Sequence, residues 1–195
     1  MNLNPELVNE VIQKRRSVFQ AQYSGERVDD AIITQMLQNA NCAPTHKLTE
    51  PWRFVVFTGA GLKRLGDFQA RLYKEVTMGD GSYRENRYQN LLTKPMLSSH
   101  IVAVCMKRDE KESLPIIEEI GAVFCAIENM YLTATAYGIG AYLSTGGITY
   151  FEEAKAFFGL SGADQLLGFL HVGIPKGALP DMKRTPVEDK VRWER

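Results

Sequence analysis

Four short segments of this 195-residue chain carry side chains suited to binding an anionic, planar ligand. The first is Arg15-Arg16-Ser17, where two guanidinium groups and a hydroxyl could clamp a phosphate. A plainer interpretation fits equally well, because cations in the last turn of a helix interact favourably with the helix dipole. These three residues therefore leave a phosphate site and an ordinary helix end open.

The second and third segments combine polar side chains with an accessible backbone. Residues 42–54, CAPTHKLTEPWRF, lead from a helix end through a polar loop into a strand, and Thr45 and His46 could hydrogen-bond the edge of a ring there. Trp52 is better explained by core packing. Residues 142–147, YLSTGG, end a strand at glycines that let a flat ligand approach closely, although a tight turn would also use them.

The fourth segment, residues 181–189, offers Lys183 and Arg184 beside a proline, a pattern that a solvated basic patch also explains. Other signatures are incomplete or missing. Residues 57–66, FTGAGLKRLG, place Arg64 where a dinucleotide fingerprint needs its third glycine. The chain has no G-x-S-x-G, C-x-x-C or H-E-x-x-H, and its three histidines are isolated. We therefore expect neither a hydrolytic nucleophile nor a bound metal.

The composition is that of an ordinary globular protein. Lys and Arg number 23 and so do Asp and Glu, which gives no reason to expect a nucleic-acid or membrane partner. The N-terminus lacks the apolar core of a signal peptide, and no apolar run reaches transmembrane length. The three cysteines, an odd number among apolar neighbours, indicate buried thiols in a reducing compartment. We expect one cytoplasmic domain over residues 1–195.

Hydrophobic periodicity predicts helices that alternate with strands. Helices are expected at 4–16, from Asp29 or Asp30 to before Pro44, and at 60–75, 116–137 and 150–158; strands are expected at 53–57, 100–106, 140–147 and 166–175. This order favours an α+β or α/β fold in which helices cover a sheet.

Three of these segments carry further expectations. The 116–137 helix is apolar nearly all round, which indicates that a second subunit covers part of it. The polar segment 73–95 is expected as a long loop, either a lid over the substrate or a plain surface excursion. Residues 176–195 are expected as a charged C-terminal arm.

Taken together and in this order, the segments resemble the nitroreductase family of FMN-dependent NAD(P)H oxidoreductases. RRSVFQ resembles the family's R-R-S motif, and APTHKLTEPWRFVVF resembles its A-P-S-x-x-x-x-Q-P-W-x-F segment. ENMYLTATAYGIGAYLSTGG resembles its central helix and flavin-edge strand, and GFLHVGIP followed by KRTPVED resembles its closing strand and R-x-P segment. The resemblance covers nearly the whole chain. It implies an α+β nitroreductase-like fold, with a central mixed sheet flanked by helices, in an intertwined homodimer with two flavins at the interface.

The resemblance also implies which residues hold the cofactor. Those expected at the FMN phosphate or ribityl chain are Arg15, Arg16, Ser17 and Arg184; those expected near the neighbouring subunit's flavin are Cys42, Thr45 and His46; those expected along the isoalloxazine ring are Leu143, Ser144, Thr145 and Gly146. The chain departs from the family pattern at Phe19, Leu48 and Glu50, where a basic residue, an asparagine and a glutamine are common. The donor to the ring's N1–C2=O edge is not identified.

The activity implied is hydride transfer from NADH or NADPH to FMN, then two-electron reduction of an electron-poor acceptor such as a nitroaromatic or a quinone. This ping-pong scheme needs no protein nucleophile. Dehydrogenation, dehalogenation or flavin fragmentation on the same scaffold are alternatives, as is a non-catalytic flavin-binding dimer.

Overall fold

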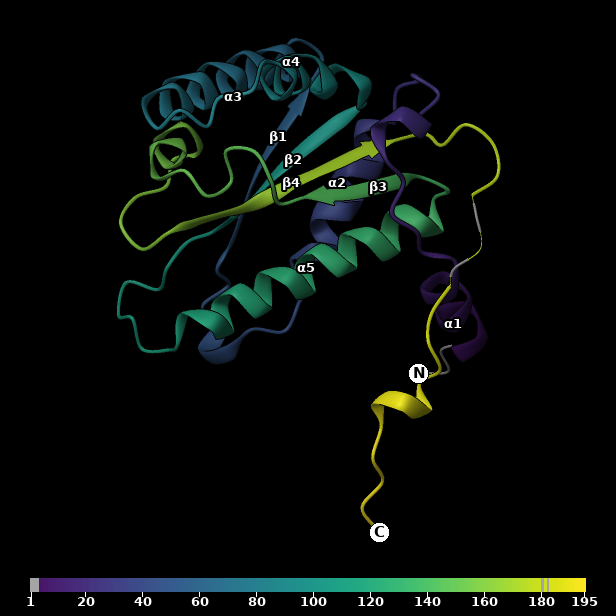
Figure 1. The fold of residues 1–195 in the computed structure, drawn as a ribbon. Coiled ribbons are helices and arrows are strands. Elements are labelled where there is room, and N and C mark those ends of the chain that lie inside the picture. Colours follow the sequence, from purple (N-terminus) through teal and green to yellow (C-terminus); the bar gives the residue numbers. More distant parts are fainter. Residues whose placement is uncertain (1–3, 180, 182) are drawn as a thin grey trace.

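Four antiparallel strands form the central sheet of the computed structural model, which describes residues 4–179, 181 and 183–195 (Figure 1). The strands are β1 (Trp52–Thr58), β2 (His100–Met106), β3 (Gly140–Ser144) and β4 (Gln165–Gly173), and they lie in the order β1-β2-β4-β3. Every neighbouring pair in this order is antiparallel. The predicted mixed sheet is therefore wrong for these strands, although an isolated parallel bridge joins Ser17 to Ala141 at the β3 edge.

The connection between β1 and β2 shows why these neighbours run in opposite directions. The helix α3 (Ala60–Gly79) leads away from the end of β1, and α4 (Glu85–Thr93) leads back towards the sheet (Figure 1). As a result β2 starts opposite the residue at which β1 ends, with Thr58 paired to His100. A single crossover helix would instead have made the two strands parallel.

The expectation of a long loop over residues 73–95 is wrong, because most of this segment is helical. Helix α3 continues to Gly79, and α4 occupies Glu85–Thr93 without burying any residue completely. Such a polar helix has little hydrophobic signal in its sequence. It is held instead by tertiary contacts: Tyr88 and Leu91 pack against the core, and the Arg84 N–H donates to the Tyr73 hydroxyl at 3.1 Å. The lid role of this segment stays a prediction.

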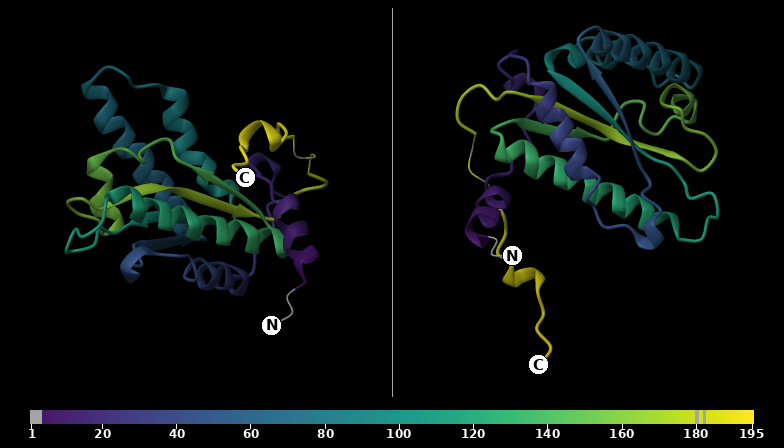
Figure 2. Two further views of the ribbon diagram at one scale, coloured as in Figure 1. Left: turned by 90° about the horizontal axis from the view of Figure 1, so that it is seen from below. Right: turned by 180° about the vertical axis from the view of Figure 1, so that it is seen from behind.

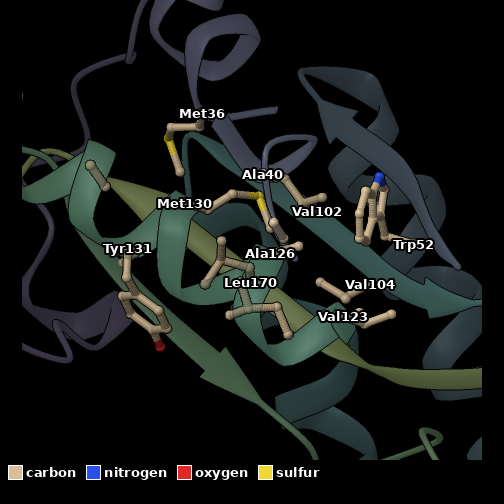
Figure 3. Close-up of a cluster of buried hydrophobic side chains, with 14 of the residues drawn as sticks. Met36, Ala40, Trp52, Val102, Val104, Val123, Ala126, Met130, Tyr131 and Leu170 are labelled. Atoms are coloured by element: carbon tan, nitrogen blue, oxygen red, sulfur yellow. The ribbon is translucent and has the colours of Figure 1, made fainter. Parts of the chain in front are cut away.

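Two helical layers cover the sheet. Helices α2 (Asp30–Ala40) and α5 (Ile116–Ala136) lie on one face, and α3 and α4 lie on the other (Figures 1 and 2). Strand β2 is buried along its whole length, so its side chains alternate between the two cores. Val102, Val104 and Met106 join the α2/α5 core of Figure 3, whereas Ile101, Ala103 and Cys105 face α3.

Several local predictions are confirmed. Strand β2 spans the predicted residues, and the Asp29 carboxylate caps α2 by accepting the Ala31 N–H at 2.9 Å. Helix α5 ends before Gly138, whose φ of 70° lies in the left-handed region that glycine adopts without strain. Trp52 is a buried core residue, and its indole N–H donates to Asn41 Oδ1 at 2.9 Å.

The cysteine prediction is wrong in part. Cys105 is buried on β2, and burial raises the pKa of its thiol to about 12. Cys42 and Cys125 are exposed in the single chain, one just after α2 and one on the outer face of α5. Apolar neighbours in the sequence do not indicate that these two thiols are buried. Cys42 lies in the loop after α2, and Cys125 lies on the side of α5 that the sheet does not cover.

Apolar side chains remain uncovered at the periphery of the chain. Helix α1 (Pro5–Lys14) has no buried residue, and Figure 1 shows the C-terminal arm running away from the domain past it. Large apolar side chains that stay exposed are found on α1 (Leu7, Val8, Ile12), on α5 (Ile117, Phe124) and on the arm (Val187, Val191, Trp193). Short 3-10 helices occupy Gln20–Gln22, His46–Leu48, Lys94–Leu97, Glu152–Phe158 and Glu188–Lys190. Among the described residues, none of the helices is long and apolar enough to cross a membrane.

Candidate functional site

The segment Arg15-Arg16-Ser17 leaves the end of α1 and runs onto the outer edge of β3. Ser17 forms the bridge with Ala141, and the Val18 N–H donates to the Ala141 carbonyl at 2.9 Å. Arg16 turns back, because its Nη1 donates to the carbonyls of Gln13 at 2.5 Å and Arg15 at 2.9 Å. Arg16 therefore satisfies carbonyls at the C-terminal end of α1, as the plainer interpretation expects.

Arg15 points the other way, towards α5. Its side chain is only 19% exposed, its guanidinium carbon lies 5.3 Å from the centre of the Tyr131 ring, and its Nε lies 3.7 Å from Glu128 Oε1. The Glu128 carboxylate is half exposed, so solvent weakens this ion pair. Arg15 thus keeps a largely buried cation beside the β3 edge, with capacity for further hydrogen bonds.

Tyr131 connects the predicted residues of this edge. Its ring belongs to the core, and its hydroxyl is turned away from the other side chains of the cluster (Figure 3). The hydroxyl accepts the Leu143 N–H at 2.6 Å. Burial raises the pKa of Tyr131, while the Leu143 N–H, the nearby Ser17 side chain and the charge of Arg15 oppose the rise. Tyr131 was not among the predicted residues, although its phenol carries a hydroxyl on a largely apolar helix.

A cavity of about 200 Å³ opens on the α3/α4 face of the sheet, where β3 ends. Two residues expected along a ring, Ser144 and Gly146, line it. A Cβ added to Gly146 would meet no atom within 4 Å, so the backbone there is open to a ligand. Polar residues that the sequence analysis did not predict complete the lining: Gln20, Gln69, Arg87, Asn90, Lys94 and His171. Arg87, Asn90 and Lys94 belong to the segment 73–95 that was expected as a lid or a surface excursion, and without α4 nothing in the sequence assigned them to the cofactor site.

His171 lies on the floor of this cavity and is only 6% exposed. Its position on β4, opposite Tyr142, directs it to the α3/α4 face, and its Nδ1 lies 3.1 Å from Ser98 Oγ. Burial lowers the pKa of His171 to about 4, so the imidazole is neutral at pH 7. His171 therefore offers hydrogen bonding without adding charge to the cavity.

Arg87 and Lys94 supply positive charge at the rim of the cavity. Neither forms an ion pair with any described carboxylate, and no acidic side chain is among the described residues that line the cavity. The Arg87 guanidinium carbon lies 5.7 Å from the centre of the Tyr73 ring, which fixes its direction. The arrangement favours a ligand with carbonyl oxygens or negative charge.

The remaining residues predicted to contact the cofactor lie apart from this group within the chain. His46 Nδ1 lies 2.5 Å from Glu118 Oε2 at the start of α5, and Thr45 Oγ1 lies 3.2 Å from Thr49 Oγ1. Cys42 is exposed, and Thr145 faces a neighbouring cavity of about 320 Å³ beside Phe124. Their roles stay predictions.

Arg184 is exposed on the C-terminal arm, where its Nη1 donates to the Lys183 carbonyl at 2.9 Å. Within one chain the structure thus gathers Arg15, Ser17 and Leu143 around Tyr131, and brings Ser144 and Gly146 to the cavity. Arg184 lies outside both groups, and its contact with a phosphate stays a prediction.

The chain is similar in sequence and in fold to known proteins. The model of the Nitroreductase family matches residues 12–174. "Putative NAD(P)H nitroreductase YfhC" of Bacillus subtilis (strain 168) is 30% identical over 185 residues, which cover 94% of this chain and 92% of that protein. A nitroreductase-like family protein from Bacillus cereus superposes with a TM-score of 0.80 at 26% identity, covering 100% of this chain and 98% of the other. The FMN-dependent nitroreductase NfnB from Mycobacterium smegmatis, solved in complex with NADPH, superposes with a TM-score of 0.74 at 16% identity, covering 98% and 99%.

Proposed function

The chain belongs to the nitroreductase family, and from this premise we propose that it is an FMN-dependent oxidoreductase driven by NADH or NADPH. The names of its relatives support both cofactors: the Bacillus subtilis relative is named as an NAD(P)H nitroreductase, and the Mycobacterium smegmatis protein as FMN-dependent. The reaction is a two-electron reduction of an electron-poor acceptor such as a nitroaromatic or a quinone. As in the sequence analysis, no protein nucleophile is required.

The observation that carries this proposal is the arrangement of two binding features along one strand edge. Arg15 and Ser17 lie beside Ala141, and the cavity with Ser144 and Gly146 begins three residues further along. Three residues of strand span roughly 10 Å, a separation suited to a sugar-alcohol chain between a phosphate and a ring. The cation and hydroxyl at one end suit the phosphate, and the open backbone and cations at the other suit the carbonyl-bearing ring.

The chemistry divides between cofactor and protein. When bound, FMN is the group that carries the two electrons. Lys94 and Arg87 would hold the carbonyl-bearing edge of the ring and favour negative charge there, because preorganised cations in a partly enclosed site act where charge develops. The Tyr131 hydroxyl accepts the Leu143 N–H beside Ser17, which fixes the β3 edge that would lie against the cofactor. Lys94 and Arg87 are our candidates for the donor that the sequence analysis left unidentified.

The working form is a homodimer with its sites at the interface. Exposed large apolar side chains on three elements support this, namely Phe124 on α5, Ile12 on α1 and Trp193 on the arm, since such side chains are the ones that a subunit interface would cover. The loop that carries His46 supports it as well. Lys47, Leu48 and Glu50 all have φ values between 43° and 55° there. Such left-handed conformations are costly for non-glycine residues and cluster at binding sites.

Anaerobic reduction of the holoenzyme tests the function. The protein is saturated with FMN, mixed with NADH or NADPH without oxygen, and followed by flavin absorbance. We expect the absorbance to bleach and to return when a nitroaromatic or a quinone is added. Bound flavin that neither coenzyme bleaches would contradict the oxidoreductase and favour a binding module. Bleached enzyme that no electron-poor acceptor reoxidises would contradict the proposed acceptor class.

A further inference from the structure

Two polar side chains on the floor of the α3/α4 cavity have unused hydrogen-bonding capacity. Gln69 on α3 is 5% exposed, and its amide has no hydrogen bond to any described residue. His171 uses Nδ1 for Ser98, and its Nε2 has no described partner. Yet no buried side-chain nitrogen or oxygen among the described residues is both sealed from solvent and unpaired. The free atoms of both residues must therefore open into the cavity that both line.

Polar atoms that open into a cavity are informative, because solvent satisfies them only while the cavity is empty. A ligand that fills the cavity has to supply those hydrogen bonds itself, since buried polar groups in proteins are rarely left unpaired. Neither residue repairs the fold by pairing with the other or with Ser144. A ligand that fills this cavity can pair with the free atoms of both residues at once.

The chemistry of the two groups defines the ligand. The amide of Gln69 presents a donor and an acceptor side by side, which complement an imide, where a carbonyl adjoins an N–H. The neutral imidazole adds one hydrogen bond without charge, and Arg87 and Lys94 favour carbonyl oxygens at the rim. A cation is disfavoured, because the described lining contains no carboxylate. These features fit an uncharged, planar heterocycle with alternating carbonyl and N–H groups.

We propose that Gln69 and His171 bind the carbonyl–imide edge of the flavin ring and so act as positioning residues for the cofactor. This inference rests on the proposed function, because it takes the ring beside Ser144 and Gly146 to be FMN. Ser98 has the supporting role: its hydrogen bond to Nδ1 fixes the rotation of the imidazole and leaves Nε2 directed at the cavity.

Flavin binding to a matched set of variants tests the role of Gln69. Dissociation constants are measured by fluorescence quenching for FMN and for FMN methylated at the ring nitrogen N3, which removes the imide N–H. Gln69→Leu removes the amide, and Gln69→Glu keeps its shape while replacing the donor. Gln89→Leu is the control, because Gln89 is an exposed residue of α4 that bonds Glu85 and does not line the cavity. Thermal melting of each apoprotein checks that it folds.

We expect wild type and the Gln89→Leu control to bind FMN about five- to tenfold more tightly than the N3-methyl analogue, the scale of one hydrogen bond. Gln69→Leu should bind FMN about five- to tenfold more weakly and discriminate little between the two flavins. Gln69→Glu should also bind FMN more weakly, because it lacks the donor to the carbonyl, but it should still prefer FMN because its carboxylate accepts the imide N–H. A folded Gln69→Leu protein that retains wild-type affinity or discrimination would overturn the assignment. If wild type binds neither flavin, the proposed function itself fails, so the two failures are distinguishable.

The His171 part is tested separately by His171→Phe, which keeps a ring of similar volume and removes Nε2. We expect a several-fold loss of FMN affinity and a shift of the bound flavin's visible absorption band, because the ring loses a hydrogen bond. His171→Gln should restore part of both. A His171→Phe protein with unchanged affinity and an unchanged band would remove His171 from the proposal.

Discussion

The packing of α4 against α3 depends on one glycine, and replacing it gives a sharp test of how the cavity is built. A Cβ added at Gly66 of α3 would lie 2.6 Å from the Leu92 carbonyl oxygen of α4. Non-bonded carbon atoms pack best at about 3.5–4.0 Å, so the two helices would have to separate by nearly 1 Å. The obstacle is backbone, which cannot rotate away as a side chain could.

Two opposing effects set the magnitude for Gly66→Ala. Replacing glycine by alanine inside a helix contributes about 1 kcal/mol of stability. Forcing an extra carbon into a close-packed contact costs about 1–3 kcal/mol, and here the upper part of that range applies because a carbonyl oxygen is met head-on. We expect Gly66→Ala to lower the free energy of unfolding by about 1–2 kcal/mol. We also expect weaker FMN binding, because α4 carries Arg87 and leads directly into Lys94.

Urea unfolding and FMN titration measure both effects, and Gly79→Ala is the matched control. Gly79 is the last residue of the same helix, and a Cβ there meets no atom within 4 Å. This control should be as stable as wild type or slightly more stable, with unchanged FMN affinity. If Gly66→Ala gains stability like its control and binds FMN normally, the close α3–α4 contact does not shape the cavity and the reasoning fails.

Three further predictions concern buried charge, pH and the phosphate. Glu119→Ala should lower the free energy of unfolding by about 3–5 kcal/mol in urea, because it strands the mostly buried Arg108 that the Glu119 carboxylate binds. Burial lowers the pKa of His171 to about 4, so its neutral ring contributes fully to the free energy of unfolding above pH 6.5, and this contribution is lost as the pH falls towards 4. Urea unfolding across this pH range should show a loss of about 3 kcal/mol in wild type. His171→Gln should lack this loss. Calorimetric titration should show that Arg184→Ala weakens FMN binding by about 1.5–3 kcal/mol. Arg15→Lys should also weaken it, because lysine lacks the bidentate fork of arginine. Unchanged affinities would remove both residues from the phosphate site.

The elements with strong periodicity could be predicted from the sequence. Strand β2 is apolar at every position, and the apolar run of α5 ends at a glycine, so each carries its own signal. Helix α4 carries almost none, since its stability comes from α3 and from the Tyr73 hydroxyl. The strand directions depended on α4 as well, because only a pair of helices returns the chain to the end of the sheet where β1 finished.

The candidate site divides in the same way. The types and spacing of Arg15 and Ser17 suggest anion binding, and that role stays a prediction. The two arginines of the motif point in different directions, and only the geometry separates Arg16, which bonds carbonyls at the end of α1, from Arg15, which faces Tyr131. Gln69 and His171 could not be predicted. They are distant in sequence, and what marks them is the absence of a described partner for their free atoms inside one cavity.

FMN titration of the purified apoprotein, with the mass of the holoprotein in solution, tests the central claim most directly. The account predicts saturation at one FMN per chain in a particle of two chains, with both lost together when Arg15 is replaced by alanine and the arm from residue 176 is removed. A monomeric particle that takes up no stoichiometric FMN would contradict it.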